Sequence, residues 1–590
     1  MANQKNQNKT CYVGLCTTYH DPAIAIIDDQ GAVLFAEATE RCLQYKRGLN
    51  CYPDSLTQIS ELISHYAENV TDFVIARNWN KQRPWYEIMW WLAGYFSPAG
   101  LTLSRHKKLS TFLPKYKLLH MLACQKYSMA GGGLNLVRML RELKPDAHIS
   151  IVDFNHHLCH AAVACYSSPY EHAACVIVDS FGDHGSSAFY QYNNGKIKRV
   201  KEISGIESLG FFYMRLTELC GFDWIKGEEW KVMGLAAYGE VNAEVCALLK
   251  PMLAVRGLGF KQNLAAIHSG FPKIEQLIED KSIQIEDIAC TGQHVFENFM
   301  LALLNHFSSR SGSNNLVLGG GCLLNSSLNG KILAETAFQS VHIPSAPGDD
   351  GTALGAAYLA YQQDHPHAQW NAQTLTPYLG SSIDTHALQR LLKFGQHSQV
   401  FHYPQTIADE TAKLLAQGAL VGWVQGRAEY GPRALGNRSI LADPRQGSMR
   451  DKINNRVKFR EQFRPFAPSI LDEYGDKYFE NYQQSPYMER TLKFKEQVCE
   501  KVPAVVHVDG TGRLQTVKHH WNPRFYQLIE AFRTATGIPL LLNTSFNVMG
   551  KPIIHTVEDA VSVFYTTGLD VLVIDDYMII KPEFMLAIQG

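Results

Sequence analysis

Short apolar runs alternate with tight polar turns in the first part of the chain, which is the pattern of β-hairpins. Five such runs span residues 12–16, 23–27, 32–36, 175–179 and 186–192. Asp28-Asp29-Gln30-Gly31 and Asn193-Asn194-Gly195 supply the tight turns of two hairpins. Because strand, polar loop, strand and tight turn occur twice in the same order, the pattern predicts an internally duplicated α/β domain.

A second α/β domain is expected towards the end of the chain. Helical periodicity is found over 56–66, 290–308 and 350–363, and buried strands are expected at 420–424, 539–542 and 571–574. The polar, proline-containing stretch 364–369 indicates a linker. We therefore expect one domain over 1–365, a linker over 366–385 and a second domain over 386–590.

Composition fits a large globular protein. The 590 residues are 46% apolar, which is enough for more than one core, and 55 Lys and Arg against 56 Asp and Glu give a net charge of -1. This balance excludes a globally basic nucleic-acid coat. The aromatic content excludes a disordered chain.

A soluble cytoplasmic protein is the expectation from three further features. The thirteen cysteines are an odd number without a Cys-x-x-Cys pair, which favours reduced thiols over a disulfide framework. The N-terminus is polar, unlike a secretory signal. The longest apolar run, 88–96, is about half the roughly 20 residues that a membrane span needs.

One helical segment carries a candidate metal site. His156 and His160 lie four residues apart and would share a helix face, where two imidazoles can chelate one divalent ion. Ordinary histidines of a partly buried helix are the alternative. Asp349, in the turn Gly348-Asp349-Asp350-Gly351, could supply a third ligand or simply cap the next helix.

Three consecutive glycines, Gly319 to Gly321, follow an apolar strand. They allow the backbone to approach a ligand closely, and a helix starting there offers N–H groups to an anion. A loop that uses glycine only for flexibility is the alternative.

Taken in order, these motifs resemble those of a known family. The head His20-Asp21-Pro22-Ala23, the His-x-x-x-His segment, the loop 178–183, the run 231–239, the triple glycine and the turn 348–351 are similar to the O-carbamoyltransferases of antibiotic and nodulation-factor biosynthesis, such as the tobramycin and cephamycin enzymes. The second domain matches over 425–441, 458–468 and 542–547. The N-terminal part most resembles the branch of the family that acts in the cyanobacterial saxitoxin pathway.

The resemblance implies a fold and a two-site reaction. An actin-like (ASKHA) N-terminal domain of two βββαβα halves would be followed by a YrdC-like α/β domain. The YrdC-like domain would form carbamoyl adenylate from carbamoyl phosphate and ATP, with Mg²⁺ accompanying the ATP. The actin-like domain would pass the carbamoyl group to a hydroxyl of a small natural product, for example the hydroxymethyl of a decarbamoyl-saxitoxin-type toxin, beside a divalent metal. By resemblance the metal is Fe²⁺, with Zn²⁺ or Mn²⁺ as alternatives; a homodimer is possible, and no nucleic acid or membrane partner is expected.

Site residues follow by motif position. The resemblance implies metal ligands His156, His160 and Asp349, catalytic residues His20, Asp179, Arg433, Lys458 and Arg464, binding residues for carbamoyl phosphate and ATP at Arg427, Arg438, Arg513, Asn543 and Ser545, and nucleotide-binding residues Gly319, Gly320, Gly321 and Asn325. Lys458 is expected to be a mobile charge that follows the migrating negative charge. His20, with an ordinary pKa near 6.5, could take the acceptor proton or bind phosphate.

Charge supports this interpretation of the second domain. Between Arg427 and Arg464 there are ten Lys and Arg against four Asp and Glu, interleaved with Gly, Pro and apolar residues. A rigid anion pocket explains this pattern better than a solvated face. A fused tRNA threonylcarbamoyl enzyme would need a separate basic surface for RNA, and an actin-like scaffold without catalysis would not need the clustered arginines.

Overall fold

The computed structural model describes residues 9–79, 115–183, 185–204, 207–370, 372–395 and 399–589. The apolar run 88–96 lies outside these ranges. The chain forms two compact units. The first contains Met1–Thr39, Arg47–Leu324 and Ile332–Leu375, and the second contains Glu40–Lys46, Asn325–Lys331 and Thr376–Gly590.

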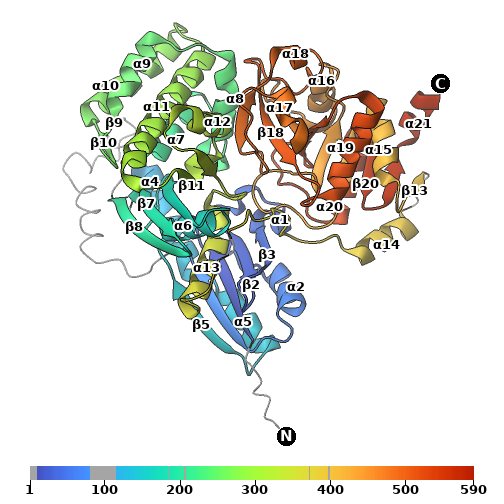
Figure 1. Ribbon diagram of the computed structural model, residues 1–590, viewed down its shortest axis with the longest axis horizontal. Helices are drawn as coiled ribbons and strands as arrows, with labels where there is room; N and C mark the ends of the chain where they lie inside the picture. Colours follow the sequence, from blue (N-terminus) through green and yellow to red (C-terminus); the bar gives the residue numbers. More distant parts are fainter. Residues whose placement is uncertain are drawn as a thin grey trace. The chain divides into compact units, whose positions relative to one another are not determined.

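Two five-stranded sheets form the frame of the first unit (Figure 1). The first sheet has the order β3-β2-β1-β4-β5, with strands β1 Thr10–Cys16, β2 Ala23–Ile27, β3 Val33–Ala38, β4 Asp72–Arg77 and β5 His148–Asp153. The second has the order β8-β7-β6-β11-β12, with strands β6 His172–Val178, β7 Gly185–Asn193, β8 Lys196–Ser204, β11 Asn315–Gly319 and β12 Ser340–His342. A separate two-stranded sheet pairs β9 Leu253–Val255 with β10 Phe260–Gln262.

The two large sheets have the same topology. In each, the first three strands in the chain are antiparallel neighbours, and the fourth and fifth add in parallel beside the first. Asn194 and Gly195 both have positive φ in the β7–β8 turn, as the Asn-Asn-Gly sequence predicts. This repeated order confirms the predicted duplicated, actin-like α/β domain.

Helices follow these strands along the chain. Those of the N-terminal half are α1 Thr39–Leu43, α2 Leu56–Tyr66, α4 Lys115–Gly131, α5 Leu134–Leu143, α6 His156–Tyr166, α7 Leu209–Leu219, α8 Glu229–Leu235, α9 Ala243–Leu249, α10 Leu264–Glu279, α11 Ile285–Ser311, α12 Ser326–Glu335 and α13 Thr352–Asp364. Helix α13, yellow in Figure 1, packs against β1 and α6. Gly14 allows this contact, because a Cβ there would lie 1.9 Å from the carbonyl oxygen of Ala353.

The second unit is built on a nine-stranded mixed sheet with the order β13-β21-β20-β14-β15-β19-β16-β18-β17. Its strands are β13 Val400–His402, β14 Val421–Val424, β15 Arg438–Ala442, β16 Ala467–Leu471, β17 Arg490–Lys493, β18 Thr511–Val517, β19 Leu540–Ser545, β20 Val571–Ile574 and β21 Tyr577–Ile580. Its helices are α14 Thr385–Phe394, α15 Ile407–Ala416, α16 Met449–Ile453, α17 Gly475–Tyr478, α18 Glu496–Cys499, α19 Pro523–Thr536, α20 Val557–Thr566 and α21 Pro582–Gln589. This α/β architecture confirms the predicted class of the second domain.

Two structural details bear on the sequence expectations. All thirteen cysteines lie within the described residues and are free thiols, as predicted. None of the helices described has both the length and the apolar character needed to cross a bilayer.

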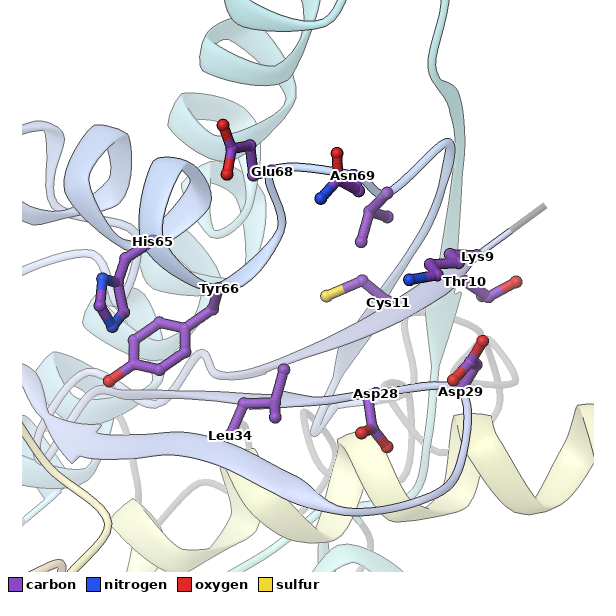
Figure 2. A pocket seen from close by; sticks show the side chains of 11 residues that line it. Lys9, Thr10, Cys11, Asp28, Asp29, Leu34, His65, Tyr66, Glu68 and Asn69 are labelled. Carbon is purple, nitrogen blue, oxygen red and sulfur yellow. The ribbon is translucent and has the colours of Figure 1, made fainter. Parts of the chain in front are cut away.

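A small cavity of about 290 Å³ opens at the start of β1 (Figure 2). Lys9 and Cys11 line it together with Asp28, Asp29 and Glu68. The seven residues of β1 span about 20 Å. This cavity therefore lies at the opposite end of the strand from the loop that carries His20.

Candidate functional site

Two histidines of helix α6 point to the same spot. The helix begins at His156 because the side chain of Asn155 caps it, accepting a hydrogen bond from the N–H of Leu158 at 3.0 Å. His156 and His160 are one turn apart, and both side chains are fully buried. Their Nε2 atoms lie 3.2 Å apart, so the helical spacing expected from the sequence is present and both nitrogens converge.

Two aspartates from other parts of the chain complete this group. Asp179 follows β6, and its Oδ2 lies 3.3 Å from the Nε2 of His156 and 3.7 Å from that of His160. Asp349 opens the short 3₁₀ helix η7 (Asp349–Gly351), and its Oδ1 lies 3.5 Å and 3.4 Å from the same two nitrogens. One donor atom from each of the four residues lies within 4.8 Å of the others.

Electrostatics in this group suit a divalent cation. Burial alone would lower the pKa of His156, but Asp349 and Asp179 outweigh it and raise this pKa to about 10. Burial would raise the pKa of Asp179, but hydrogen bonds with His156 and His160 hold it well below its usual value. Two imidazoles and two ionised carboxylates are the donor set of Fe²⁺, Zn²⁺ or Mn²⁺ sites, so these residues fit a bound metal without selecting one.

The side chain of Asn78 connects two members of this group. Its Oδ1 accepts from the N–H of Thr17 at 2.8 Å, which fixes Nδ2 as the donor to the Oγ1 of Thr352 at 2.7 Å. The hydroxyl of Thr352 donates to the carbonyl oxygen of Asp349 at 2.5 Å. The Nδ2 of Asn78 also lies 3.4 Å from the Nδ1 of His156, so one buried amide links two of the four residues.

The three glycines bring the backbone against Asp179. Gly319 ends β11, and Gly320 has a φ of +95°. A Cβ on Gly320 would lie 2.3 Å from the carbonyl oxygen of Val178, so only glycine fits there. The N–H of Gly321 donates to Asp179 Oδ1 at 3.2 Å. The observed contacts of these glycines therefore orient a carboxylate of the site, and their nucleotide role stays a prediction.

His20 reaches the same place from the loop after β1. Its Nδ1 lies 3.6 Å from Asp349 Oδ2 and 2.9 Å from Asp21 Oδ2, and its side chain is 13% exposed. Arg47 in turn donates from Nη2 to Asp21 Oδ2 at 2.8 Å. The structure thus brings together five residues that the sequence analysis named, which are His20, His156, His160, Asp179 and Asp349.

Glu229, at the start of α8, is a further acid near His20. Burial raises the pKa of Glu229, while the charges of Arg47 and His20 oppose that rise. Burial also raises the pKa of the Cys322 thiol, with Asp179 and Glu229 adding to it. Glu229 is thus coupled electrostatically to Arg47, His20 and Cys322.

Lys458 occupies a different buried position, in the second unit. It ends a π-helical turn, η8 (Asn454–Lys458), and is 3% exposed. Its ammonium donates to Asn547 Oδ1 at 2.7 Å and to the Asn547 carbonyl at 3.0 Å, and it also contacts the carbonyl and, at 3.3 Å, the Oγ of Ser545. A mobile charge is expected at this position from the sequence, whereas these four oxygens hold the ammonium in place.

Four arginines are linked to this lysine electrostatically, since Arg460 and Arg464 act on both Lys458 and Arg513, and Arg433 acts on Arg513. Together with Lys458 they form what we call the cationic group, which consists of Arg433, Lys458, Arg460, Arg464 and Arg513. Burial and the charges of Arg433, Arg460 and Arg464 hold the pKa of Arg513 well below its usual value. Burial, Arg460 and Arg464 do the same to Lys458. Like charges gathered in a poorly solvated place form an anion-binding arrangement.

Several other members of the basic run have acidic partners, as Arg464 of the cationic group has in Glu461. Arg445 pairs with Asp443, and Lys452 and Arg456 pair with Asp570. The positive excess counted in the sequence is therefore concentrated in fewer side chains than the ten that the run contains.

Arg427 and Arg438 hold backbone. Arg438 is 1% exposed and donates to the carbonyl oxygens of Gln425 at 2.7 Å and Gly426 at 3.1 Å. Arg427 donates from Nε to the carbonyl oxygen of Gly380 at 3.0 Å. Neither contributes to the pKa shifts of Lys458 or Arg513, so the structure does not place them in the cationic group, and their substrate-binding role stays a prediction.

The remaining predicted residues have local partners. Asn543, buried in β19, donates to Ser469 Oγ at 2.9 Å and Gln515 Oε1 at 3.1 Å, and among the described residues its Oδ1 has no hydrogen-bond donor. Ser545 lies beside Lys458. Asn325 caps α12, because its Oδ1 accepts from the N–H of Leu328 at 3.1 Å.

Sequence reasoning missed five residues of these sites, which are Asp21, Arg47, Asn78, Glu229 and Arg460. Three of them stand inside or beside quoted motifs, so motif adjacency was an available signal. Arg47 and Asn78 carry no local signal, because an arginine in a turn and an asparagine after a strand are common features of loops.

Known proteins match most of this chain. Residues 11–358 match the family described as carbamoyltransferase N-terminus, and residues 412–581 match carbamoyltransferase C-terminus. The chain is 37% identical over 439 residues to nodulation protein NolNO of Sinorhizobium fredii, covering 72% of this chain and 63% of that protein. It is 32% identical over 624 residues to an uncharacterized Synechocystis protein, sll1178, with 97% of each chain covered.

Solved structures are more distant. Full-length HypF, in a phosphate- and nucleotide-bound form, is 13% identical with a TM-score of 0.34, over 62% of this chain and 56% of that one. The N-terminal family match alone spans more than half of the 590 residues, and the C-terminal match covers most of the second unit. Both matches are to the same family. This chain belongs to the carbamoyltransferase family.

Proposed function

We propose that this chain is an O-carbamoyltransferase that works in two steps at its two buried sites. In the second unit, water releases phosphate from carbamoyl phosphate, and the resulting carbamate attacks the α-phosphorus of ATP. Pyrophosphate leaves and carbamoyl adenylate forms. In the first unit, the acceptor hydroxyl attacks the carbamoyl carbon, AMP leaves, and the hydroxyl proton passes to His20.

One observation carries the proposal: a carbamoyltransferase chain holds a partly buried cationic group in one unit and a buried His–Asp group in the other. Carbamoyl phosphate and ATP together bring about six negative charges near neutral pH. Arg433, Arg460, Arg464 and Arg513 would offset the repulsion between these anions and bind their phosphate oxygens in pairs. Lys458, already fixed by the loop after β19, would stabilise the charge that develops on the departing pyrophosphate.

The first unit has the groups that acyl transfer to an alcohol needs. The Nδ1 of His20 faces two carboxylates, Asp21 and Asp349, so the proton of the neutral ring resides on Nδ1 and Nε2 is the basic nitrogen. A divalent cation bound by His156, His160, Asp179 and Asp349, Fe²⁺ by resemblance, would supply Lewis-acid polarisation of the carbamoyl carbonyl.

For the acceptor, we propose a cationic natural product with a free hydroxymethyl group, of the decarbamoyl-saxitoxin type. Support comes from Glu229, a partly exposed acid whose electrostatic neighbours include His20. A guanidinium of the acceptor can pair with such a carboxylate while its hydroxyl lies near the base.

Two assays on the full-length chain test this function. Pyrophosphate release from ATP should require carbamoyl phosphate, and mass spectrometry should detect carbamoylated product when decarbamoyl saxitoxin is added. Lys458→Ala should stop both reactions, whereas His156→Ala should keep pyrophosphate release and lose bound metal and product. Arg456→Ala, on the same turn as Lys458 but paired with Asp570, should keep both activities. Pyrophosphate release at the normal rate from Lys458→Ala would refute the assignment.

A further inference from the structure

Two strained residues meet beside His20. Asp21 has a φ of +55° and Arg47 a φ of +62°, values that residues other than glycine rarely adopt. The N–H of Asp21 donates to the carbonyl of Arg47 at 2.7 Å, so the two unusual backbones support each other. Strain of this kind persists only where the surrounding structure enforces it, and it is concentrated at functional sites.

The guanidinium of Arg47 joins two parts of the first unit. It donates to Asp21 Oδ2 from Nη2 at 2.8 Å and from Nε at 3.2 Å. Its Nη1 donates to the carbonyl oxygens of Trp224 at 3.0 Å and Ile225 at 3.2 Å, in the 3₁₀ helix η3 (Trp224–Lys226). Gly227 makes room for the arginine stem, since a Cβ there would lie 2.8 Å from the Cδ of Arg47.

Asp21 connects this arginine to the histidine. The same Oδ2 that accepts from Arg47 lies 2.9 Å from His20 Nδ1. The geometry has the order of a Ser–His–Asp triad, in which a carboxylate fixes the tautomer and direction of the imidazole that acts as base. In such triads, changing the aspartate to asparagine lowers kcat about 10⁴-fold because the imidazole adopts the wrong tautomer.

We propose that Asp21 and Arg47 are positioning residues for carbamoyl transfer. Asp21 holds the proton of His20 on Nδ1 and directs Nε2 at the acceptor hydroxyl, and Arg47 holds Asp21 against η3. The inference rests on the proposed function, which makes His20 the proton acceptor.

A comparable ion pair in the same unit provides a control. Arg77 donates to Asp153 from Nε at 2.6 Å and from Nη2 at 3.0 Å, also with two bonds. Within the part of the chain that the structure describes, the side chain of Asp153 pairs with Arg77 and not with a histidine. Breaking that pair should therefore affect stability and leave the transfer rate unchanged.

Asp21→Asn is the decisive variant, because asparagine tolerates positive φ and keeps the side-chain shape. With metal-loaded protein, ATP, carbamoyl phosphate and decarbamoyl saxitoxin, we expect kcat for transfer to fall about 10²–10³-fold, with an acceptor KM within about 3-fold of wild type. Metal content and carbamoyl-phosphate-dependent pyrophosphate release should not change. Asp153→Asn should leave kcat unchanged.

A double-mutant cycle separates positioning from general damage. In a His20→Gln background, Asp21→Asn should lower the transfer rate no further, because its effect passes through His20. An equal loss in both backgrounds, or no loss with His20 present, would overturn the proposal. Nitrogen NMR of histidine-labelled protein, assigned by difference from His20→Gln, should show the Nδ1–H tautomer in wild type and its loss in Asp21→Asn. That spectrum tests the positioning even if wild-type protein carbamoylates no acceptor, a result that would refute only the proposed function.

Discussion

Replacing Arg460 with methionine should stabilise the protein while weakening its binding of anions. The guanidinium of Arg460 lies 4.5 Å from the ring centre of Phe466, and its Nε donates to Asn454 Oδ1 at 3.0 Å. Its Nη2 is buried without a hydrogen-bond partner among the described residues. Burial and the charge of Arg464 lower the pKa of Arg460 from 12.5 to about 9. Methionine keeps the contact with the ring and removes the charge.

The expected gain follows from that pKa. The difference between a pKa of 12.5 and one of about 9 corresponds to a free-energy cost of about 5 kcal/mol for keeping the guanidinium charged in the folded protein. Partial exposure of the side chain reduces this cost to about 2–3 kcal/mol. The variant also loses the hydrogen bond to Asn454, which reduces the gain in stability by about 1 kcal/mol. Because folding lowers the pKa of a cation, its charge opposes folding at every pH below about 9, and the opposition fades as the pH rises from about 9 towards 12.5. Near neutral pH we therefore expect a net gain of about 1–2 kcal/mol.

Thermal unfolding near neutral pH measures both effects. The ligand-free variant should melt about 2–6 °C higher than wild type. Added pyrophosphate should raise the melting temperature of wild type more than that of Arg460→Met, because the variant has lost part of the anion site. Arg456→Met, which removes an exposed partner of Asp570, should cost at most about 1 kcal/mol and keep the full response to pyrophosphate. A destabilised Arg460→Met with an undiminished pyrophosphate response would refute this account of the cationic group.

Two further predictions concern the first unit. Gly320→Ala should lower the free energy of unfolding in urea by about 2–4 kcal/mol and lower the metal content, because its Cβ would meet the Val178 carbonyl at a φ of +95° and displace the backbone that holds Asp179. Gly312 also has a positive φ, but the space around it is open. The control variant Gly312→Ala should therefore cost only about 1 kcal/mol and keep the metal. Glu229→Gln should raise the KM for decarbamoyl saxitoxin about 10-fold without changing pyrophosphate release, and an unchanged KM would exclude Glu229 from acceptor binding.

Local patterns in the sequence were sufficient to predict many of the helices and strands. The helix Leu56–Tyr66 and the strand Val571–Ile574 have the bounds that periodicity predicted, because each is bordered by residues that end it. The spacing of His156 and His160 could be placed on one helix face for the same reason. These features depend on neighbours within a few residues, which a single sequence displays.

Contacts between residues far apart in the chain could not be predicted from local sequence patterns. Asp349 is nearly 200 residues from His156 in the chain, and only the parallel addition of β11 beside β6 and the turn after β12 bring the two together. Residues Glu40–Lys46 and Asn325–Lys331 belong to the second unit, although no change in composition marks them. Within that unit, a Cβ on Gly330 would lie 2.0 Å from the Thr491 carbonyl, a contact that depends on the fold alone.

The near-neutral total charge of the chain conceals two opposed concentrations of charge. In the first unit, ionised Asp21, Asp179 and Asp349 gather near His20, so that site attracts cations, whether a metal or a charged acceptor. In the second unit the cationic group attracts phosphates. The cationic group opposes folding and is relieved by anionic ligands, which is why a variant that removes charge there should gain stability and lose binding. In the first unit, by contrast, the histidine partners hold the pKa values of Asp179 and Asp349 below their usual range, so the ionised aspartates stabilise the folded state. The net charge of -1 reveals neither site. The lowered pKa values of the aspartates in the first unit and of the cationic group in the second reveal both.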